Sequence, residues 1–181
     1  MTLYIVGSPN CRKVIATKNY LNLDCEVVKL NPFEGDLKKH CSLAIDPSST
    51  IPALRDGNFE LWESNAIMIY MASYRSHPTF FPEDIVKRAD ILRWLFWELA
   101  YFNQTVDSAG LSVKFYRYLQ HLNKQFEGKL FITGEYLTLA DFALGSMVVY
   151  AQQQGAVFKD YPNIQTWYER LERIPAWAQS E

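Results

Sequence analysis

The first third of the chain places short hydrophobic runs on either side of a helical pattern. Leu3–Val6 and Glu26–Leu30 are rich in β-branched residues, which predicts two buried strands. Between them, apolar residues recur at helical spacing over Arg12–Leu21, with Asn10 as the expected N-cap. A strand, a helix and a second strand in this order predict a parallel pair with a crossover helix.

The following segment predicts a weak polar helix, a hairpin and a further helix. The polar helix is expected over Asp36–Ala44. Two short apolar runs, Ile51–Leu54 and Phe59–Trp62, flank an Asp-Gly-Asn sequence, which is a strong turn signal. A helical run then opens at Ser64 and ends near Arg75. The order β-α-β, α, β-β-α is that of a thioredoxin-like domain.

The second half predicts only helices. Beyond a proline-containing stretch at residues 77–84, we find no strand alternation, and glycines separate four helical runs. The runs are Ile85–Phe102, Val113–Phe126, Thr138–Gln153 and Ile164–Leu171. We therefore expect a thioredoxin-like domain at residues 1–76, a linker at 77–84 and an all-helical domain at 85–181.

Two of the predicted helices have a more detailed pattern. Thr138 and Asp141 form a capping-box pattern, and replacing either by Ala should cost about 1 kcal/mol. In the first helix of the second half, either of two apolar stripes could face the core, and the second, an aromatic stripe, is described below. The stripe expected to face the core is Ile85, Ala89, Leu92, Phe96 and Leu99.

Composition and charge narrow the classes of partner. The 181 residues carry 18 Lys and Arg against 20 Asp and Glu, so there is no basic excess for nucleic acid or an anionic membrane. No segment is apolar enough to span a membrane, and the amino terminus does not resemble a signal peptide. Three cysteines without a CxxC pair and scattered histidines predict reduced thiols in the cytoplasm and no metal site.

Several motifs, in their order and spacing, resemble the cytosolic glutathione transferases over nearly the whole chain. The motifs are SPNCRKV at Ser8–Val14, STIPAL at Ser49–Leu54, LWESNAI at Leu61–Ile67, TLAD at Thr138–Asp141, and Pro162 followed by Trp167 and Arg170. The first motif is most similar to bacterial members with a phi-like serine or a nu-like Pro-Asn turn. The resemblance implies glutathione as co-substrate.

The resemblance implies that the turn before the first helix carries the chemistry. The Ser8 hydroxyl is expected to donate to the glutathione sulfur, aided by the positive end of the helix. Lowering the thiol pKa by about 2 units requires about 2.7 kcal/mol, which one charge-assisted hydrogen bond and a helix dipole can supply. Asn10 is either a second donor or only a helix cap.

Cys11 offers a different chemistry at the same helix start. A thiol there can have a lowered pKa and can form a mixed disulfide with glutathione. The alternative is a small side chain turned inward, since free cysteines are among the most buried residue types.

The resemblance also implies a set of residues that hold the glutathione peptide. Ile51 and Pro52 begin a strand, and a cis bond between them would leave the Ile51 main chain free to pair with an extended peptide. Glu63 and Ser64 stand at a helix start, which suits an ammonium and a carboxylate, although Ser64 acting only as an N-cap is the alternative.

The glycyl carboxylate of glutathione requires a cation. Lys38 matches the lysine of the family in this segment, and a solvated lysine pair with Lys39 is the plain alternative. Leu37 stands where a histidine is usual, and Thr50 replaces a longer polar residue before the Ile-Pro pair. Both replacements remove polar contacts, so we expect a weakened affinity for glutathione, with Thr50 still beside the peptide.

A small hydrophobic electrophile would bind between the domains. Pro9 and the aromatic stripe Trp94, Trp97 and Tyr101 are the expected lining, unless the stripe belongs to the core. The link between Phe102 and Val113 is short for the family. The resemblance implies a homodimer, and the short link predicts a smaller interface or a more open cleft.

Three functions remain open from these motifs. The first is glutathione transfer to an electrophile. The second is a glutathione-dependent disulfide reductase or deglutathionylase that uses Asn10 or Cys11. The third is a non-catalytic interaction protein with the same fold, since a fold does not determine a function.

Overall fold

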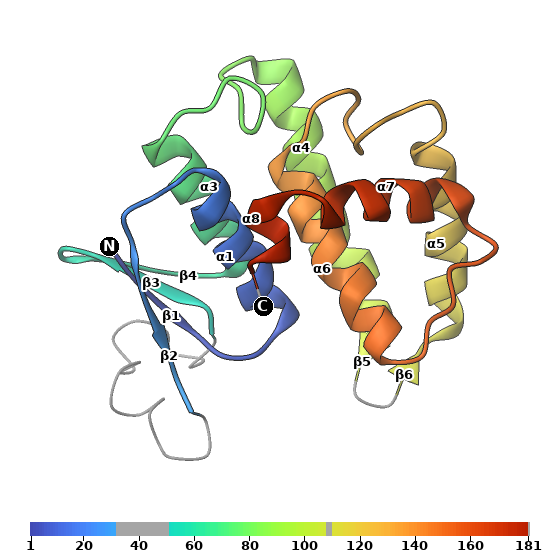
Figure 1. Ribbon diagram of the computed structural model, residues 1–181, viewed down its shortest axis with the longest axis horizontal. Helices are drawn as coiled ribbons and strands as arrows, with labels where there is room; N and C mark the ends of the chain where they lie inside the picture. Colours follow the sequence, from blue (N-terminus) through green and yellow to red (C-terminus); the bar gives the residue numbers. More distant parts are fainter. Residues whose placement is uncertain (32–50, 108–109, 181) are drawn as a thin grey trace.

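The computed structural model describes residues 1–31, 51–107 and 110–180. Among these described residues, those of the first half form a four-stranded sheet with two helices (Figure 1). The elements are β1 at Thr2–Ile5, α1 at Pro9–Tyr20, β2 at Glu26–Lys29, β3 at Ala53–Asp56, β4 at Phe59–Trp62 and α3 at Ser64–Tyr74. The strand order is β2-β1-β3-β4, with β2 parallel to β1 and β3 antiparallel to both of its neighbours. This is the thioredoxin-like arrangement that the sequence predicts; the expected helix over Asp36–Ala44 lies outside the described residues.

The start of α1 differs from the sequence-based prediction. Its N-cap is Ser8, whose hydroxyl oxygen accepts from the Cys11 amide at 3.3 Å, and Pro9 occupies the first helical position. Proline suits this position because its missing amide hydrogen would have no partner there. Asn10 is therefore inside the first turn, and its predicted role as N-cap is wrong.

The second half is helical apart from one short ribbon. The main helices are α4 at Ile85–Trp97, α5 at Val113–Gln125, α6 at Leu139–Gln153, α7 at Pro162–Glu172 and α8 at Pro175–Ala178. A π-helical turn at Glu98–Phe102 and a 3-10 turn at Asn103–Thr105 follow α4, and β5 at Val106–Asp107 pairs with β6 at Gly110–Leu111. The ribbon and α8 are absent from the prediction because two to four residues are too short to show a period.

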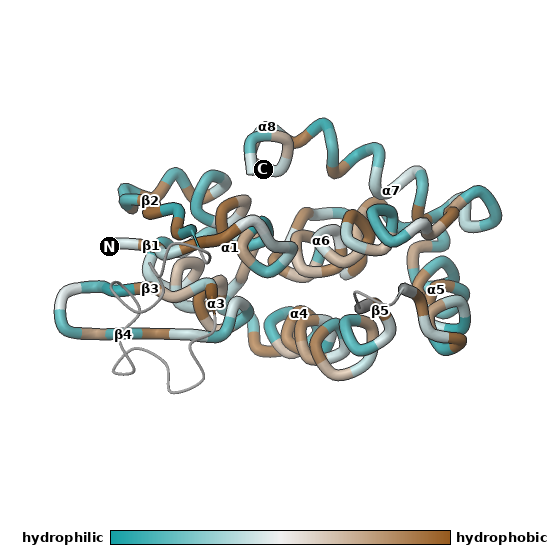
Figure 2. Tube along the Cα trace, turned by 90° about the horizontal axis from the view of Figure 1, so that it is seen from below, coloured by the Kyte–Doolittle hydropathy of each residue, from teal (hydrophilic) through white to brown (hydrophobic). Residues whose placement is uncertain are grey.

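The two halves share one hydrophobic core, which includes residues from Leu3 in β1 to Trp177 in α8. α6 lies at its centre with α4 and α7 on opposite sides, and α1 lies between the sheet and α6 (Figures 1 and 2). The connection between α3 and α4 belongs to this core, because Phe80 is buried and its ring packs against Tyr20 and Phe142. No helix in the described part of the chain is long and apolar enough to cross a membrane.

The orientation of α4 is the main departure from the sequence-based prediction. Phe96 is 66% exposed and Ile85 is 81% exposed, although both belong to the stripe expected to face the core. Ile91, Leu95 and Phe102 are buried instead. Apolar residues of α4 lie on most faces of the helix itself. The 3.6-residue period alone therefore did not identify the face that packs against the core.

Candidate functional site

Ser8 is held at the end of β1 with its hydroxyl hydrogen available. The Oγ atom accepts from the Cys11 amide, and a hydroxyl keeps its one hydrogen to donate when it accepts in this way. The N-cap position also places the oxygen at the positive end of the α1 dipole. An anionic sulfur beside Ser8 would therefore meet both a donor and a favourable potential.

Asn10 and Ser64 connect the starts of two helices. The Ser64 hydroxyl donates to Asn10 Oδ1 at 3.4 Å, and Ser64 is buried at 7% exposure. Ser64 is the first helical residue of α3 and Glu63 is its N-cap, with no side-chain capping bond. Neither residue is the N-cap of its helix, and their side chains bond to each other. These contacts do not fit the alternatives in which Asn10 or Ser64 acts only as a helix cap.

Glu63 has an unusual backbone conformation between β4 and α3. Its φ is +71° and its ψ is 111°, and its side chain is exposed. A non-glycine residue in such a region costs about 1–3 kcal/mol and persists where surrounding structure imposes it. The conformation brings an exposed carboxylate next to the amino-terminal amides of α3, so both signs of charge are available at one place for a zwitterion.

Cys11 faces inward. It is 1% exposed, and its sulfur accepts from the Val6 amide at 3.3 Å. Burial raises the pKa of the Cys11 thiol, although hydrogen bonds with Ser8 and the Val6 backbone act in the opposite direction. A protonated, inaccessible thiol is a poor nucleophile, so the contacts favour the packing alternative for Cys11 over the disulfide chemistry.

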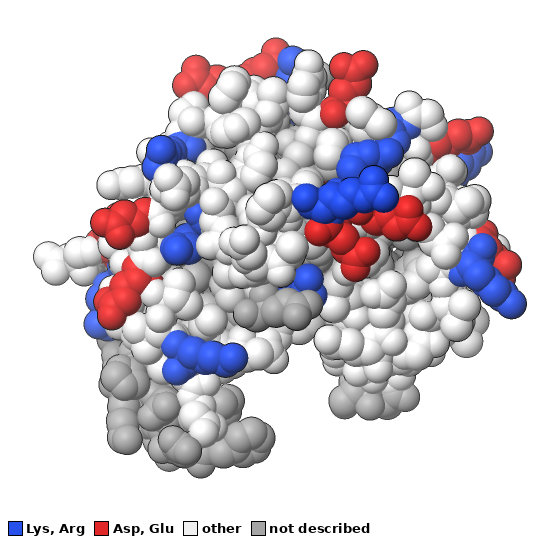
Figure 3. All heavy atoms as spheres, viewed as in Figure 1, with Lys and Arg blue, Asp and Glu red and all other residues white. Residues whose placement is uncertain are grey.

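A hollow of about 370 Å³ lies beside Ser8 between the two halves of the chain. It is lined from the first half by Ser8, Pro9 and Ile15 among others, and from the second half by Val149 and Gln153 of α6. Over the face shown in Figure 3, acidic and basic side chains are interspersed rather than gathered in a single patch. Next to the Ser8 hydroxyl, the hollow offers aliphatic contacts together with the cationic side chains of Arg12 and Lys29.

Part of the predicted peptide-binding set is described. The Ile51–Pro52 bond is cis, Pro52 is buried, and Ile51 is partly exposed at the entrance to β3. Lys38 and Thr50 lie outside the described residues, as does Leu37.

The aromatic stripe of α4 does not join Pro9 at the hollow beside Ser8. Trp97 packs against Tyr118 of α5 at 5.8 Å between ring centroids, and Tyr101 packs against the same ring at 6.2 Å. Trp94 and Trp97 line a separate hollow with Arg93, His121 and Gln125, all from α4 and α5. The hollow beside Ser8 is therefore lined by Pro9 but not by Trp94, Trp97 or Tyr101. Trp94 is buried in the bundle, whereas Tyr101 is 52% exposed.

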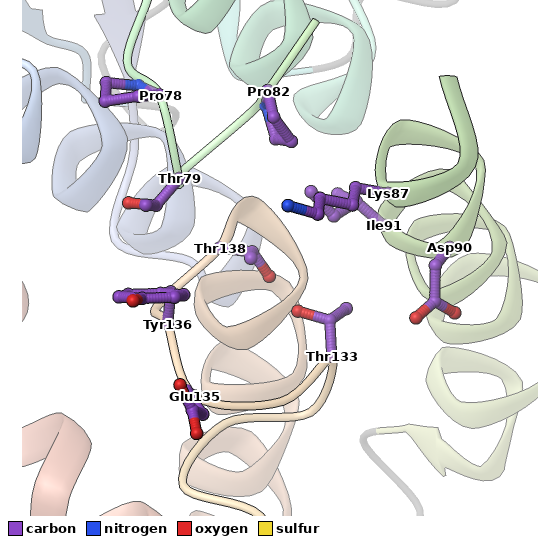
Figure 4. A pocket seen from close by; sticks show the side chains of 10 residues that line it. All are labelled: Pro78, Thr79, Pro82, Lys87, Asp90, Ile91, Thr133, Glu135, Tyr136 and Thr138. Carbon is purple, nitrogen blue, oxygen red and sulfur yellow. The ribbon is translucent and has the colours of Figure 1, made fainter. Parts of the chain in front are cut away.

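Another hollow, of about 220 Å³, lies between the connection before α4 and the loop before α6 (Figure 4). The Lys87 side chain extends toward Thr133 and Thr138 across it. None of the predicted site residues that the structure describes lines this hollow. The described residues also contain no group of three or more His, Cys, Asp or Glu that could hold a metal ion.

A buried polar cluster joins the two halves near the candidate site. Lys13 Nζ in α1 and Glu98 Oε2 in the π-helical turn are 3.0 Å apart, and both side chains are fully buried. Asn65 of α3 donates to the same Glu98 oxygen at 3.2 Å. Sequence reasoning did not identify this cluster. The only signal in the sequence is that Lys13 falls on the apolar side of α1, between Ala16 and Thr17 in helical register.

Comparisons with known proteins agree with this geometry. Residues 3–79 match the family model for the glutathione S-transferase N-terminal domain, and residues 99–175 match the model for the C-terminal domain. Over 198 aligned positions, the chain is 26% identical to glutathione S-transferase D6 of Drosophila melanogaster, covering 99% of this chain and 91% of that protein.

Solved structures with high similarity include two insect enzymes. A delta-class glutathione transferase of Nilaparvata lugens has a TM-score of 0.88 and 27% identity, covering 99% of this chain and 92% of that one. A Bombyx mori glutathione transferase has a TM-score of 0.86 and 28% identity, covering 96% and 87%. All three of these relatives are insect proteins, so they do not confirm the expectation of a bacterial member.

Proposed function

This chain belongs to the cytosolic glutathione S-transferase family, and from that premise we propose that it conjugates glutathione to a small hydrophobic electrophile. The observation that carries the proposal is the Ser8 hydroxyl. It stands at the N-cap of α1, its oxygen is oriented by the Cys11 amide, and it borders the hollow between the two halves. Ser8 is thus suited to stabilise a thiolate by donating its hydrogen.

In the proposed reaction, the glutathione thiol loses its proton to solvent and Ser8 donates a hydrogen bond to the thiolate. The sulfur then attacks an electrophilic carbon, a sulfur–carbon bond forms, and the leaving group departs with its electron pair. Pro9 and the aliphatic residues of the hollow beside Ser8 would receive the electrophile. With a lowering of about 2 pKa units from an ordinary thiol value of about 8.5, the thiolate fraction at pH 7 rises about 25-fold.

The peptide of glutathione is proposed to lie across the starts of β3 and α3. Ser64 and the first amides of α3 would hold the γ-glutamyl carboxylate, and Glu63 would take its ammonium. The Ile51 main chain, next to Pro52, would pair with the peptide. Lys38 and Thr50 complete the proposed set near the glycyl end. Asn10 would act indirectly, because its Oδ1 accepts from the Ser64 hydroxyl.

We propose a homodimer as the working state, in the cytoplasm, where Cys11 and Cys25 stay reduced as free thiols. Two groups of exposed apolar residues suit a two-fold interface. In such an interface, the first group of one protomer would contact the second group of its partner, and the reverse. The first group consists of Ile85, Val86 and Phe96 on α4 with Leu99 in the π-helical turn; the second consists of Phe59, Trp62 and Tyr74 on β4 and α3. Both α3 and α4 lie on the side of the molecule opposite α7 and α8 (Figure 2).

Replacing Ser8 by Ala tests the proposal. With glutathione and 1-chloro-2,4-dinitrobenzene at pH 7, we expect the conjugate, followed by its absorbance, to form about 25-fold more slowly. The loss of about 2.7 kcal/mol of thiolate stabilisation returns the thiol pKa to its ordinary value. Ser8→Ala also removes a helix cap worth about 1 kcal/mol.

Thr138→Ala is the matched control, since it removes the hydroxyl at the N-cap of α6 away from the hollow beside Ser8. It should lower the melting temperature by a similar amount and leave the rate unchanged. Equal rates for wild type and Ser8→Ala would refute the role of Ser8. Calorimetric titration that detects no glutathione binding at millimolar concentration would refute the transferase proposal as a whole.

A further inference from the structure

The Lys13–Glu98–Asn65 cluster connects one carboxylate to both helices of the candidate site. Glu98 belongs to the second half of the chain, whereas Lys13 lies in α1 and Asn65 in α3. Lys13 Nζ and Asn65 Nδ2 both approach the same oxygen, Oε2, at 3.0 and 3.2 Å. Asn65 also donates to the Leu95 carbonyl at 3.1 Å, which fixes its amide against α4.

The cluster lies close in sequence to the residues that would meet glutathione. Lys13 is in the second turn of the helix that Ser8 caps, and Asn65 directly follows Ser64. Glu98 is therefore linked, through one side chain each, to the start of α1 and the start of α3. The hydrogen bond between Ser64 and Asn10 joins the same two helix starts directly.

Stability alone does not account for this arrangement. Both charged side chains are fully buried, and removing them from water is expensive, so apolar residues of similar size often do as well or better. In addition, Glu98 Oε1 and Asn65 Oδ1 are buried without a hydrogen-bond partner among the described residues. Because the Lys13–Glu98–Asn65 contacts are directional and costly to bury, we expect that they fix the geometry of the helices that carry them.

We propose that Glu98 is a positioning residue that sets the relative placement of the amino-terminal ends of α1 and α3. The inference rests on the proposed transferase function, because those ends carry Ser8 and Ser64. A displacement of about 1 Å at a reacting centre can change a rate about 100-fold, so the alignment of the Ser8 hydroxyl with the sulfur depends on this placement. The π-helical turn that contains Glu98 is a type of element often found at functional sites.

Glu98→Gln tests the inference, because it keeps the shape of the side chain and removes the charge opposite Lys13. Two readouts are needed. Hydrogen exchange of backbone amides should become about tenfold faster in the first turns of α1 and α3 but not in α7. The pKa of the bound glutathione thiol, followed by thiolate absorbance, should rise by about one unit, which lowers the thiolate fraction about threefold at pH 7.

Asp141→Asn is the matched control, since Asp141 is also a fully buried carboxylate but lies in α6. It should lower the melting temperature without changing either readout. The double variant Lys13→Met with Glu98→Met removes the ion pair and retains packing. It should recover the melting temperature lost in Glu98→Gln while the thiol pKa stays raised, which a merely structural role would not produce.

Two results would overturn the inference. The first is Glu98→Gln with unchanged amide exchange and unchanged thiol pKa. The second is a double variant in which the thiol pKa returns to the wild-type value together with the melting temperature. If wild-type protein does not ionise bound glutathione, the proposed function fails, and the amide exchange of Glu98→Gln still decides whether Glu98 positions the two helices.

Discussion

Ser8 and Cys11 stand within one turn of each other at the same helix start, yet their surroundings differ. Both residues line the hollow between the two halves, but Cys11 is only 1% exposed and its sulfur accepts from the Val6 amide at the end of β1. Desolvation raises the pKa of the Cys11 thiol and outweighs the lowering effect of its hydrogen bonds with Ser8 and the Val6 backbone. The helix end thus favours an anion brought from outside over one formed on the protein.

Alkylation of Cys11 should be slow and strongly dependent on pH. Because its pKa is raised above the ordinary value of 9.0, the thiol stays protonated at pH 7 to 8, and reaction with iodoacetamide should accelerate only as the pH rises beyond that value. Mass spectrometry of peptides after timed labelling measures the rate. Urea-unfolded protein is the control and should react with an ordinary thiol profile.

Cys11→Ala should keep full conjugating activity, since no step of the proposed reaction uses the sulfur. Its effect should be limited to packing, at about 1 kcal/mol of unfolding free energy. A mixed disulfide with oxidised glutathione at Cys11, together with lost activity in Cys11→Ala, would instead support the disulfide reductase alternative.

At the start of α6, the buried carboxylate of Asp141 connects the helix to neighbouring elements. The capping box predicted at Thr138 and Asp141 is present, with the Thr138 amide donating to Asp141 Oδ2 at 2.9 Å. The other carboxylate oxygen accepts from the Ile132 amide at 2.9 Å and from Trp167 Nε1 at 3.0 Å. Burial raises the pKa of Asp141 to about 6, against the opposing effect of these hydrogen bonds, so the carboxylate is largely ionised at pH 7.

Asp141→Ala should therefore cost far more than the estimate of about 1 kcal/mol for a cap. It leaves buried donors on Ile132, Thr138 and Trp167 unpaired, at roughly 1–3 kcal/mol each, so we expect a loss of about 3–5 kcal/mol. Thr138→Ala should stay near 1 kcal/mol. Urea unfolding monitored by tryptophan fluorescence gives both values, and similar losses for the two variants would contradict the shared role of Asp141.

Elements with one clear period were predictable from the sequence, and α4 shows why others were not. β1, β2, β4 and α3 appear within one or two residues of their predicted positions because turn residues and caps bound each apolar run. In α4, apolar residues occupy several faces, so the choice between the Phe96 stripe and the Ile91 stripe depends on where α6 lies. The Lys13–Glu98 pair depends on tertiary contact in the same way, since its members are far apart in sequence.

At the scale of the whole molecule, the exposed stripe of α4 predicts the oligomeric state. Phe96→Glu should convert the protein to a monomer, because it places a charge in the apolar group that the partner would cover. Analytical ultracentrifugation of wild type and variant measures this. Val157→Glu is the control, since Val157 is 59% exposed in the loop between α6 and α7.

The wild-type dimer should dissociate in the micromolar range, about −8 kcal/mol, because the connection between the π-helical turn and α5 is short. Where the structure describes it, this connection holds a 3-10 turn and a short ribbon. The same short connection should leave the cleft more open than in relatives with longer helices. A dimer that persists at nanomolar concentration would contradict the reduced interface, and a Phe96→Glu dimer would contradict its location.

The continuous core and the Lys13–Glu98 pair have a consequence for recombination between relatives. The family models divide the chain into two segments, but the segments are not interchangeable modules, because the cation from one half neutralises the anion from the other. A chimera that takes its thioredoxin-like half from a relative without a cation at this position would enclose an unbalanced Glu98. Such hybrids should fold only when the exchange point, or a compensating substitution, keeps the two charges together.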